Sequence, residues 1–486
     1  MPSKIKQLIA VFLLGLLLRV WDLSGNPAGV YVDEAHLGYT AYSLLHTGKD
    51  SYGKSWPIMT KLFGSYSSAL YSYLTVLPVG LMGLNIFTTR LLSAVSGSLL
   101  VLIAGIAFGP FTGLVIAVSP VFVFFSRAAF EANLALTLLI ISLVLFFRSR
   151  LSLSALFLSL SAYAYHAEKL IAPIILIFFW MFYRSARKRL LVPVLIFVIT
   201  QLPLWMVSLN PAVNQRFYEL SYSGSLPEKT LTFIKNYLGY LSPDNLFSRP
   251  DPDVQRSFPE ISVFYWWMII PAIMGLASKK PKLIFLTIFL SIIPGAVTRD
   301  YFSTIRVLPA FVGMAVLISY GLKSLFIRWP VPVVIIIIFS LLGLYSNLCL
   351  LKFERSSVWG YQYRQLAEFV GSHPDENVII DNSRQKPLYI LLAFYNRWPP
   401  SLLQSRYSAS WLADYYSHPE FSSDADIRNI SIRPIDWKKD ATRSAFLIGD
   451  KLAISPDQIS EHHLRLVTWV ADLAGDPRLQ ILQTGY

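Results

Sequence analysis

The chain has 486 residues, of which 54% are hydrophobic and only 15% are charged, and its mean hydropathy is +0.50. Soluble globular proteins carry about a quarter charged residues, so this composition argues against an ordinary soluble enzyme. Apolar blocks of roughly 15–20 residues alternate with short basic clusters, which is typical of a polytopic membrane protein. The single cysteine, Cys349, excludes an intramolecular disulfide framework and a metal site built from several cysteines.

The formal net charge is +13, which in a soluble protein would suggest a nucleic-acid partner. Here much of the basic excess lies in short clusters between apolar blocks, and such clusters mark the cytoplasmic side of a membrane. The charge therefore predicts topology and contacts with membrane lipids, and no nucleic acid. The clusters are Arg148 and Arg150; Arg184, Arg187, Lys188 and Arg189; Lys279, Lys280 and Lys282; and Lys323 and Arg328.

The first apolar run, residues 8–18, follows two lysines and is not followed by a small-residue cleavage site. We therefore predict a retained first helix with a cytoplasmic N-terminus. The four basic clusters fix four cytoplasmic loops, so the segments between them face outward. Those outer segments are 126–132, 164–169, 209–262 and 296–307.

Because each crossing moves the chain to the other side of the membrane, the same alternation of sides determines the remaining spans. Residues 91–126 must form two short spans that turn inside at 109–113, and residues 67–84 are then an interfacial helix rather than a crossing. With a last span near 330–350, the sequence predicts a mainly α membrane protein of about eleven transmembrane helices, with its termini on opposite sides.

From residue 352 onward the composition changes and charged residues become frequent. Short β-rich runs at 377–380, 445–448 and 464–470 alternate with helical stretches such as 387–395, a pattern that indicates a small α/β domain. We expect two domains, a membrane domain over residues 1–351 and an extracytoplasmic α/β domain over residues 352–486.

Ionisable residues that interrupt the apolar blocks all fall in segments predicted to face outward. Such residues are costly at a membrane and tend to mark functional sites, so the pattern predicts a single pocket. They are Asp33, Glu34, Arg90, Arg127, Glu131, His166, Lys169, Arg299, Asp300 and Arg306.

Several of these residues also have a purely structural interpretation. Asp33 and Glu34 precede a helical stretch, so they either stabilise its N-terminus or supply a general base or metal ligand. Arg127 and Glu131 are four residues apart, so they either form a helical ion pair or bind a phosphate and provide a second acid. Lys169 either extends to the membrane interface or neutralises a phosphate.

In their order along the chain, these residues resemble the GT-C glycosyltransferases, most closely the bacterial branch related to protein O-mannosyltransferases and lipid A aminoarabinose transferases. The resemblance covers roughly residues 8–350. The similar elements are 32–45 with 47–53, Arg90–Ala94, Ser119–Pro120 with Ser126–Arg127, Tyr163–Ala167, 236–247 and Arg306–Pro309.

The resemblance implies a GT-C fold and inverting transfer of a sugar from a polyprenyl-phosphate donor to a glycan, lipid or protein acceptor outside the cell membrane. It implies Asp33 as the base with Glu34 beside it and Glu131 as the second acid. The implied ligands of the donor phosphate are Arg90, Arg127, His166, Lys169 and Arg306. Asp33 and Glu131 are the candidates to hold a divalent metal ion, which Arg127 and Lys169 could make unnecessary.

One stretch departs from the family. Relatives often carry an acidic residue, a lysine and a proline where this chain has Gly64–Tyr71, and Lys61 is the nearest replacement for that lysine. The alternatives are a transporter, flippase or glycan polymerase, and an inactive scaffold. Transporters show repeated halves and helices broken at the bilayer midplane. The sequence shows neither feature, and the glycosyltransferase is therefore favoured.

Overall fold

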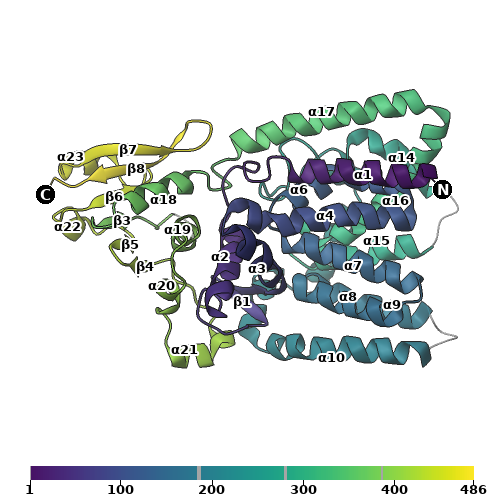
Figure 1. Cartoon of the computed structure of the whole chain (residues 1–486), viewed down its shortest axis with the longest axis horizontal. Helices are drawn as coiled ribbons and strands as arrows, with labels where there is room; N and C mark the ends of the chain where they lie inside the picture. Colours follow the sequence, from purple (N-terminus) through teal and green to yellow (C-terminus); the bar gives the residue numbers. More distant parts are fainter. Residues whose placement is uncertain (1, 183–187, 278–281, 385–386, 486) are drawn as a thin grey trace.

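A computed structural model describes residues 2–182, 188–277, 282–384 and 387–485, and these residues are mainly helical. Arg184, Arg187, Lys279 and Lys280, which belong to two of the predicted cytoplasmic clusters, lie outside the described residues. A bundle of apolar helices is followed by a C-terminal unit, residues 355–485, built around a small β-sheet (Figure 1). The N- and C-termini lie at opposite ends of the long axis.

The bundle helices run roughly along the long axis of the molecule (Figure 1). Among the described residues, four helices, 86–108, 188–208, 308–328 and 330–354, are long and apolar enough to span a membrane, and the bent pair α5–α6 would be a fifth. The bundle elements are α1 (Pro2–Val20), α4 (Ile86–Phe108), α5 (Pro110–Val118), α6 (Pro120–Arg127), α7 (Glu131–Phe147), α8 (Leu151–Ala164), α9 (Glu168–Phe182), α10 (Leu191–Ser208), α14 (Ile269–Leu276), α15 (Lys282–Ala296), α16 (Leu308–Arg328) and α17 (Pro330–Glu354).

The chain changes direction twice between α4 and α6, once at each of two prolines. Helix α4 ends at Phe108, and Pro110 begins α5, so the chain turns at the expected position, 109–113. Helices α5 and α6 meet at 63°, because Pro120 has no N–H to continue the ladder. Arg19 of α1 donates to the freed carbonyls of Ile116 (3.1 Å) and Ala117 (3.2 Å), so the break is satisfied inside the protein.

The segment after α1 forms α2 (Val32–Thr47), a hairpin of β1 (Met59–Leu62) and β2 (Ser65–Ser68), and α3 (Leu70–Met82). These elements lie at the end of the bundle that faces the C-terminal unit (Figure 1). The expected interfacial helix over 67–84 begins later, at Leu70, because β2 occupies its first residues. With 13 residues, α3 is too short to cross a bilayer alone.

The long segment between α10 and α14 contains only short helices. They are η2 (Pro211–Asn214), α11 (Gln215–Leu220), α12 (Leu226–Gly239), α13 (Pro243–Phe247) and η3 (Trp266–Met268), and η4 (Thr304–Arg306) follows α15. This segment carries several of the polar side chains of the site described below.

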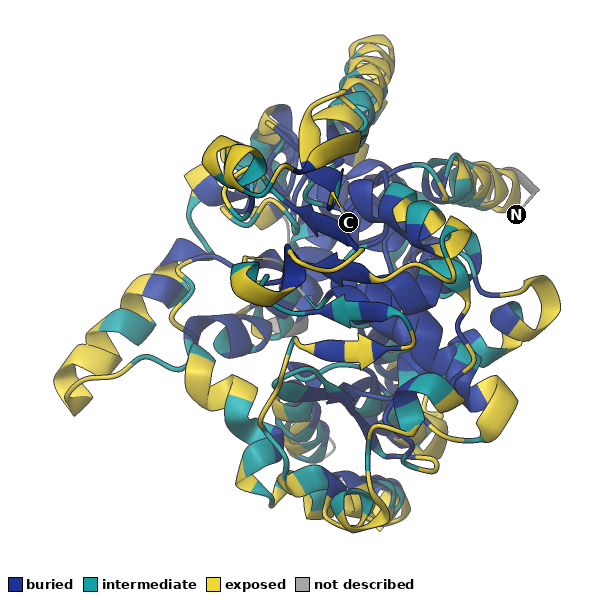
Figure 2. Ribbon diagram, turned by 90° about the vertical axis from the view of Figure 1, so that its left-hand side faces the viewer, coloured by how far each residue is buried: buried dark blue, intermediate teal, exposed yellow. Residues whose placement is uncertain are grey.

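The C-terminal unit has a six-stranded sheet in the order β4-β5-β3-β6-β8-β7, with parallel pairing only among β5, β3 and β6. Strands β3, β6 and β7 lie where the sequence predicts β-rich runs. Figure 2 shows buried residues gathered at the centre of this end of the molecule and exposed residues on its outlying helices. The elements are α18 (Gln362–Ser372), β3 (Val378–Ile380), α19 (Leu388–Asn396), α20 (Ser401–Gln404), α21 (Ala409–Ala413), η5 (Tyr415–Ser417), β4 (Ala425–Ile427), β5 (Ile430–Ile432), α22 (Trp437–Asp440), β6 (Phe446–Gly449), α23 (Pro456–Glu461), β7 (Arg465–Ala471) and β8 (Pro477–Gln483).

Two glycines let the backbone of the C-terminal unit cross directly over the start of α2. Gly29 has a φ of +90°, and a Cβ there would lie 2.5 Å from the amide nitrogen of Tyr361. Gly360 has a φ of +76°, and a Cβ there would lie 2.8 Å from the carbonyl oxygen of Val30. The junction therefore depends on backbone-to-backbone contact that only glycine permits.

We expect Gly29→Ala to destabilise the protein by about 2–4 kcal/mol, because it adds steric overlap to the roughly 1 kcal/mol cost of a positive φ. Gly83→Ala is the matched control, since Gly83 has a φ of +74° and a Cβ there would have no heavy atom within 4 Å. Thermal unfolding in detergent micelles measures both variants. Equal losses of stability would show that the junction is not tightly packed.

Candidate active site

A buried ion pair joins α2 to α4. Arg90 donates from Nε to Oε1 of Glu34 and from Nη2 to Oε2, both at 2.8 Å, and the two residues are 0% and 3% exposed. The other three N–H groups of Arg90 donate to the carbonyls of Leu23, Pro27 and Gly29. A guanidinium has five N–H donors, so Arg90 has none left for a ligand.

Both carboxylate oxygens of Glu34 already accept hydrogen bonds from the protein. Its carboxylate also accepts from the backbone N–H of Tyr31 (3.2 Å) and of Ala129 (2.8 Å). The pair therefore fixes the loop before α2 against α4 and the start of α7. This arrangement supports a positioning role for both residues, in place of the catalytic role implied for Glu34 and the phosphate contact implied for Arg90.

Arg127 is also fully buried, and it donates hydrogen bonds to backbone carbonyls. Its two Nη groups donate to the carbonyls of Leu18 (2.8 Å), Trp21 (2.8 Å) and Asn26 (3.0 Å), at and just past the end of α1. Within the described residues it forms no ion pair with Glu131. Its guanidinium thus satisfies the orphan carbonyls of a helix C-terminus, a role that neither sequence-based interpretation included.

Asp33 and Glu131 come together although they are 98 positions apart. Asp33 is partly exposed in the first turn of α2, and Glu131 is partly exposed at the first residue of α7. The charge of Asp33 acts on Glu131, so the two carboxyl groups share one electrostatic environment. Burial raises the pKa of the Tyr31 phenol, and the nearby charges of Asp33 and Asp253 raise it further.

Cations from the long outer segment and from the loop after α15 lie beside these acids. Arg306 pairs with Asp300 at 2.8 Å, and Arg256 contacts the same carboxylate at 3.6 Å and Asp253 at 3.2 Å. Burial raises the pKa of Tyr165 to about 12, while the charges of Arg306 and Arg256 lower it. The charge of Glu131 also acts on Tyr165, so this phenol is near both an acid and the two cations.

The loop between α8 and α9 places His166 and Lys169 against the β1–β2 hairpin. His166 Nε2 lies 2.9 Å from the carbonyl of Tyr66 and therefore donates to it. Burial, together with the charge of Lys169, lowers the pKa of His166 to about 3, so its ring is neutral at pH 7 and offers no charge to a phosphate. Lys169 Nζ contacts the Met59 sulfur at 3.3 Å, and no carboxylate in the described chain lies within ion-pair distance of it.

The hairpin is held from the other side by the C-terminal unit. The Tyr415 hydroxyl accepts from the backbone N–H of Lys61 and donates to Asp50. Lys61 Nζ donates to the His418 carbonyl and lies 5.3 Å from the Tyr66 ring. Lys61 is thus engaged by the C-terminal unit, which argues against it as the substitute for the lysine missing from Gly64–Tyr71.

The sequence interpretation missed three residues of this site. Arg256 lies in segment 209–262, for which the sequence predicts only that it faces outward. The spacing of Asp251, Asp253 and Arg256 is the signal that could have found it. Tyr165 and Glu168 flank His166, and Glu168 is 2% exposed with one carboxylate oxygen lacking a hydrogen-bond partner in the described structure. Arg299, by contrast, is exposed and does not join the site.

No group of three or more His, Cys, Asp or Glu side chains among the described residues could hold a metal ion. Two carboxylates such as Asp33 and Glu131 hold Mg²⁺ only together with waters and substrate phosphates. The expectation that these two residues hold a divalent ion therefore stays a prediction.

We expect Glu34→Gln to destabilise the protein by about 3–5 kcal/mol, because it leaves the buried Arg90 guanidinium without its counter-charge. Asp33→Asn, one residue earlier and partly exposed, should change the unfolding temperature little. Thermal unfolding of both variants in the same detergent makes the comparison. A Glu34→Gln protein as stable as the wild type would remove the pair from its structural role.

Searches of protein-family models and of curated proteins find no match to this chain. Solved structures of ArnT from Cupriavidus metallidurans do match it. The apo structure is 13% identical, covers 99% of this chain and 98% of its own, and has a TM-score of 0.61. The structure bound to undecaprenyl phosphate is 12% identical, covers 98% and 97%, and has a TM-score of 0.62. At these identities the likeness concerns the fold, and the predicted resemblance to GT-C membrane glycosyltransferases is confirmed at that level.

Proposed function

We propose that the chain is an inverting glycosyltransferase that moves a sugar from a polyprenyl-phosphate donor to a hydroxyl group of an acceptor. The observation that carries the proposal is the meeting of Asp33 and Glu131 with Arg256 and Arg306 around Tyr165. Transfer from a lipid phosphate needs a base for the acceptor and cations for the departing phosphate, and this arrangement provides both. The fold is one in which ArnT binds undecaprenyl phosphate.

In the proposed reaction Asp33 is the general base. It takes the proton from the acceptor hydroxyl while that oxygen attacks the anomeric carbon from the face opposite the phosphate. The bond between the anomeric carbon and the phosphate oxygen breaks, and polyprenyl phosphate leaves with its electron pair. Glu131 lies near enough to orient the acceptor or to support the positive charge that develops on the sugar ring.

The phosphate of the donor is assigned to Lys169, Arg256 and Arg306. Lys169 is the strongest candidate because its ammonium contacts only a thioether in the described structure. Arg256 and Arg306 share the Asp300 carboxylate and retain N–H groups for a ligand. Arg90 and Arg127 are not assigned to the phosphate, because Arg90 donates to Glu34 and backbone carbonyls and Arg127 donates to backbone carbonyls. His166 is not assigned to it because its ring is neutral.

The topology belongs to the same proposal. About eleven helical segments cross the plasma membrane, the N-terminus is cytoplasmic, and the site and the C-terminal unit face outward. The two domains divide near residue 352. The proposed reaction uses no metal ion, because Lys169, Arg256 and Arg306 supply the positive charge that the departing phosphate needs. The acceptor is a hydroxyl-bearing glycan, lipid or protein.

We expect Asp33→Asn to abolish transfer while leaving the protein folded and inserted, because the amide cannot accept the acceptor's proton. The assay offers a panel of polyprenyl-phosphate sugars and a membrane extract to proteoliposomes that contain the purified protein. Loss of a general base lowers the rate by about 10²–10⁴-fold.

Asp244→Asn is the matched control for Asp33→Asn, since Asp244 is an outer-segment acid that pairs only with the exposed Arg249 in the described structure. Transfer should also persist in EDTA. Near-normal turnover by Asp33→Asn would place the base elsewhere. No transfer by the folded wild-type protein with any donor would favour an inactive scaffold or a transporter.

We expect Lys169→Gln to raise the KM for the donor while the KM for the acceptor stays unchanged. A charge-assisted hydrogen bond contributes about 1.5–3 kcal/mol, which corresponds to roughly 10–100-fold in kcat/KM. Lys229→Gln, an exposed substitution on α12, is the control for loss of positive charge. An unchanged donor KM in Lys169→Gln would exclude this lysine from the phosphate site.

A further inference from the structure

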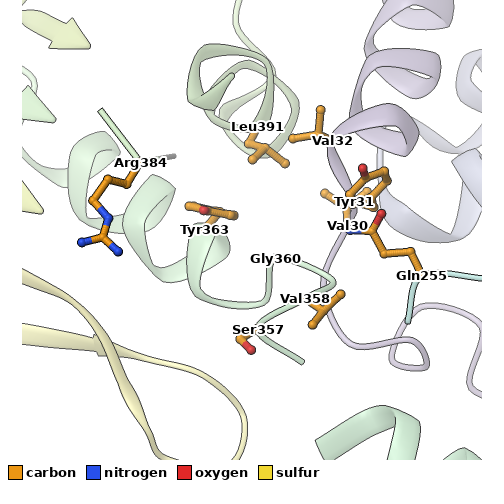
Figure 3. Close-up of a pocket in the computed structure, with 10 residues that line it drawn as sticks. All are labelled: Val30, Tyr31, Val32, Gln255, Ser357, Val358, Gly360, Tyr363, Arg384 and Leu391. Atoms are coloured by element: carbon orange, nitrogen blue, oxygen red, sulfur yellow. The ribbon is translucent and has the colours of Figure 1, made fainter. Parts of the chain in front are cut away.

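Two cavities share one wall residue, Ser357, in the connection between α17 and α18. The interdomain cavity, of about 360 Å³, lies between the membrane bundle and the C-terminal unit, with Tyr31 and Tyr363 in its wall (Figure 3). The second cavity, of about 380 Å³, is lined by the start of α18, the turn after β6 and the start of β8. We call it the α18–β8 cavity, and the described residues that line it all belong to the C-terminal unit.

The α18–β8 cavity lies at the carboxyl end of the parallel strands. Asp450, Lys451 and Leu452 in its wall directly follow β6, which pairs in parallel with β3. Open α/β sheets bind ligands outside the carboxyl ends of such strands. The described lining residues include none of those proposed for sugar transfer. The cavity is therefore a second candidate site, separate from the transfer chemistry.

Two cations line this cavity. Arg478 donates from Nε to the buried carboxylate of Asp472 at 2.8 Å, which fixes the guanidinium, while its Nη1 donates no hydrogen bond within the described residues. Lys451 Nζ lies 5.3 Å from the centroid of the Trp469 ring and forms no ion pair in the described part of the chain. A positioned guanidinium and an unpaired ammonium are the groups that bind a phosphate.

The wall also offers unused acceptors. Gln362 is 7% exposed, and its Nε2 donates to the Ser357 carbonyl at 3.2 Å, whereas its Oε1 has no hydrogen-bond partner in the described structure. Asp450 accepts two backbone N–H groups with Oδ1, while its Oδ2 lies 3.8 Å from Arg384. An ammonium group only donates, so it matches an amide oxygen together with a carboxylate oxygen.

The cavity is also close to the end of an apolar helix. Ser357 follows Glu354, the last residue of α17, by three residues, and such a segment spans at most about 11 Å. Helix α17 is long and apolar enough to span a membrane, and Phe353 in its last turn is 50% exposed. A lipid beside α17 therefore has its headgroup near this cavity.

We propose that the α18–β8 cavity binds a phosphoethanolamine group, with the phosphate at Lys451 and Arg478 and the ammonium at Asp450 and Gln362. This group is the headgroup of a zwitterionic phospholipid and also exists as a soluble compound. Bound in the cavity, it links α18 to the turn after β6 and to β8, and a lipid-borne group also holds the C-terminal unit at the membrane surface. The inference does not rest on the proposed transfer reaction.

The test measures occupancy by protection of a cysteine from labelling. Leu452→Cys, at a wall residue that is 72% exposed, is placed in a Cys349→Ser background. The full-length protein in detergent micelles is labelled with a maleimide. By mass action, soluble phosphoethanolamine at twice its Kd should slow labelling about threefold. Ser372→Cys, exposed at the far end of α18, should label at the same rate with and without the compound.

Two variants test the two ends of the ligand. Lys451→Gln should raise the Kd for phosphoethanolamine about tenfold or more, because it removes a charge-assisted hydrogen bond. Lys438→Gln, exposed on α22, is the matched control for loss of positive charge. Asp450→Asn should weaken binding of phosphoethanolamine and leave binding of inorganic phosphate unchanged.

Nanodiscs distinguish the two sources of the group. Labelling of Leu452→Cys is compared in phosphatidylethanolamine and in phosphatidylglycerol, which has the same phosphodiester without the ammonium. Slower labelling in phosphatidylethanolamine identifies the lipid as the source, and equal rates together with protection in micelles identify the soluble compound.

Protection by phosphoethanolamine in micelles, or by phosphatidylethanolamine in nanodiscs, supports the proposal if Lys451→Gln weakens it. Three results overturn the proposal: no protection by either form, equal protection by inorganic phosphate, and protection that Lys451→Gln leaves unchanged.

Discussion

The bidentate pair between Glu34 and Arg90 is the interaction on which the end of the bundle facing the C-terminal unit depends. Residues 21–31 leave α1 without regular structure, and their buried carbonyls need hydrogen-bond donors from the protein. Arg90 supplies three of those donors and Glu34 supplies the charge that lets Arg90 remain buried. Both Asp33 and the cavity wall formed by Tyr31 take their positions from this loop.

The five arginines in and around the candidate site divide into two groups according to the groups they contact. Arg19, Arg90 and Arg127 are buried and hydrogen-bond carbonyls that a helix end or a proline has left unpaired. Arg256 and Arg306 share the carboxylate of Asp300, and we propose them as ligands of the donor phosphate. Arginine suits both tasks because its planar fork of five donors matches several carbonyls or a single phosphate equally well.

The C-terminal unit contributes to the site without supplying any of the proposed catalytic side chains. Tyr415 hydrogen-bonds Asp50 and the backbone of Lys61, which holds the β1–β2 hairpin in place. Burial raises the pKa of Asp50 to about 6, and the Tyr415 hydroxyl opposes that rise by donating to its carboxylate. The hairpin in turn contacts His166 and Lys169, so the position of Lys169, which we propose as a phosphate ligand, depends on contacts made more than 200 residues later in the chain.

The sequence by itself determined the membrane class, the main apolar blocks, the turn at 109–113 and three strands of the C-terminal sheet. These are local properties, because hydropathy and strand patterning act over a few residues. It could not assign Arg90 and Arg127, since an arginine's role depends on which carbonyls or carboxylates reach it, and here those lie 56–109 positions away. The β1–β2 hairpin, the inclusion of Arg256 and the interdomain cavity were likewise decided only by tertiary structure, because each arises where separate segments pack against one another.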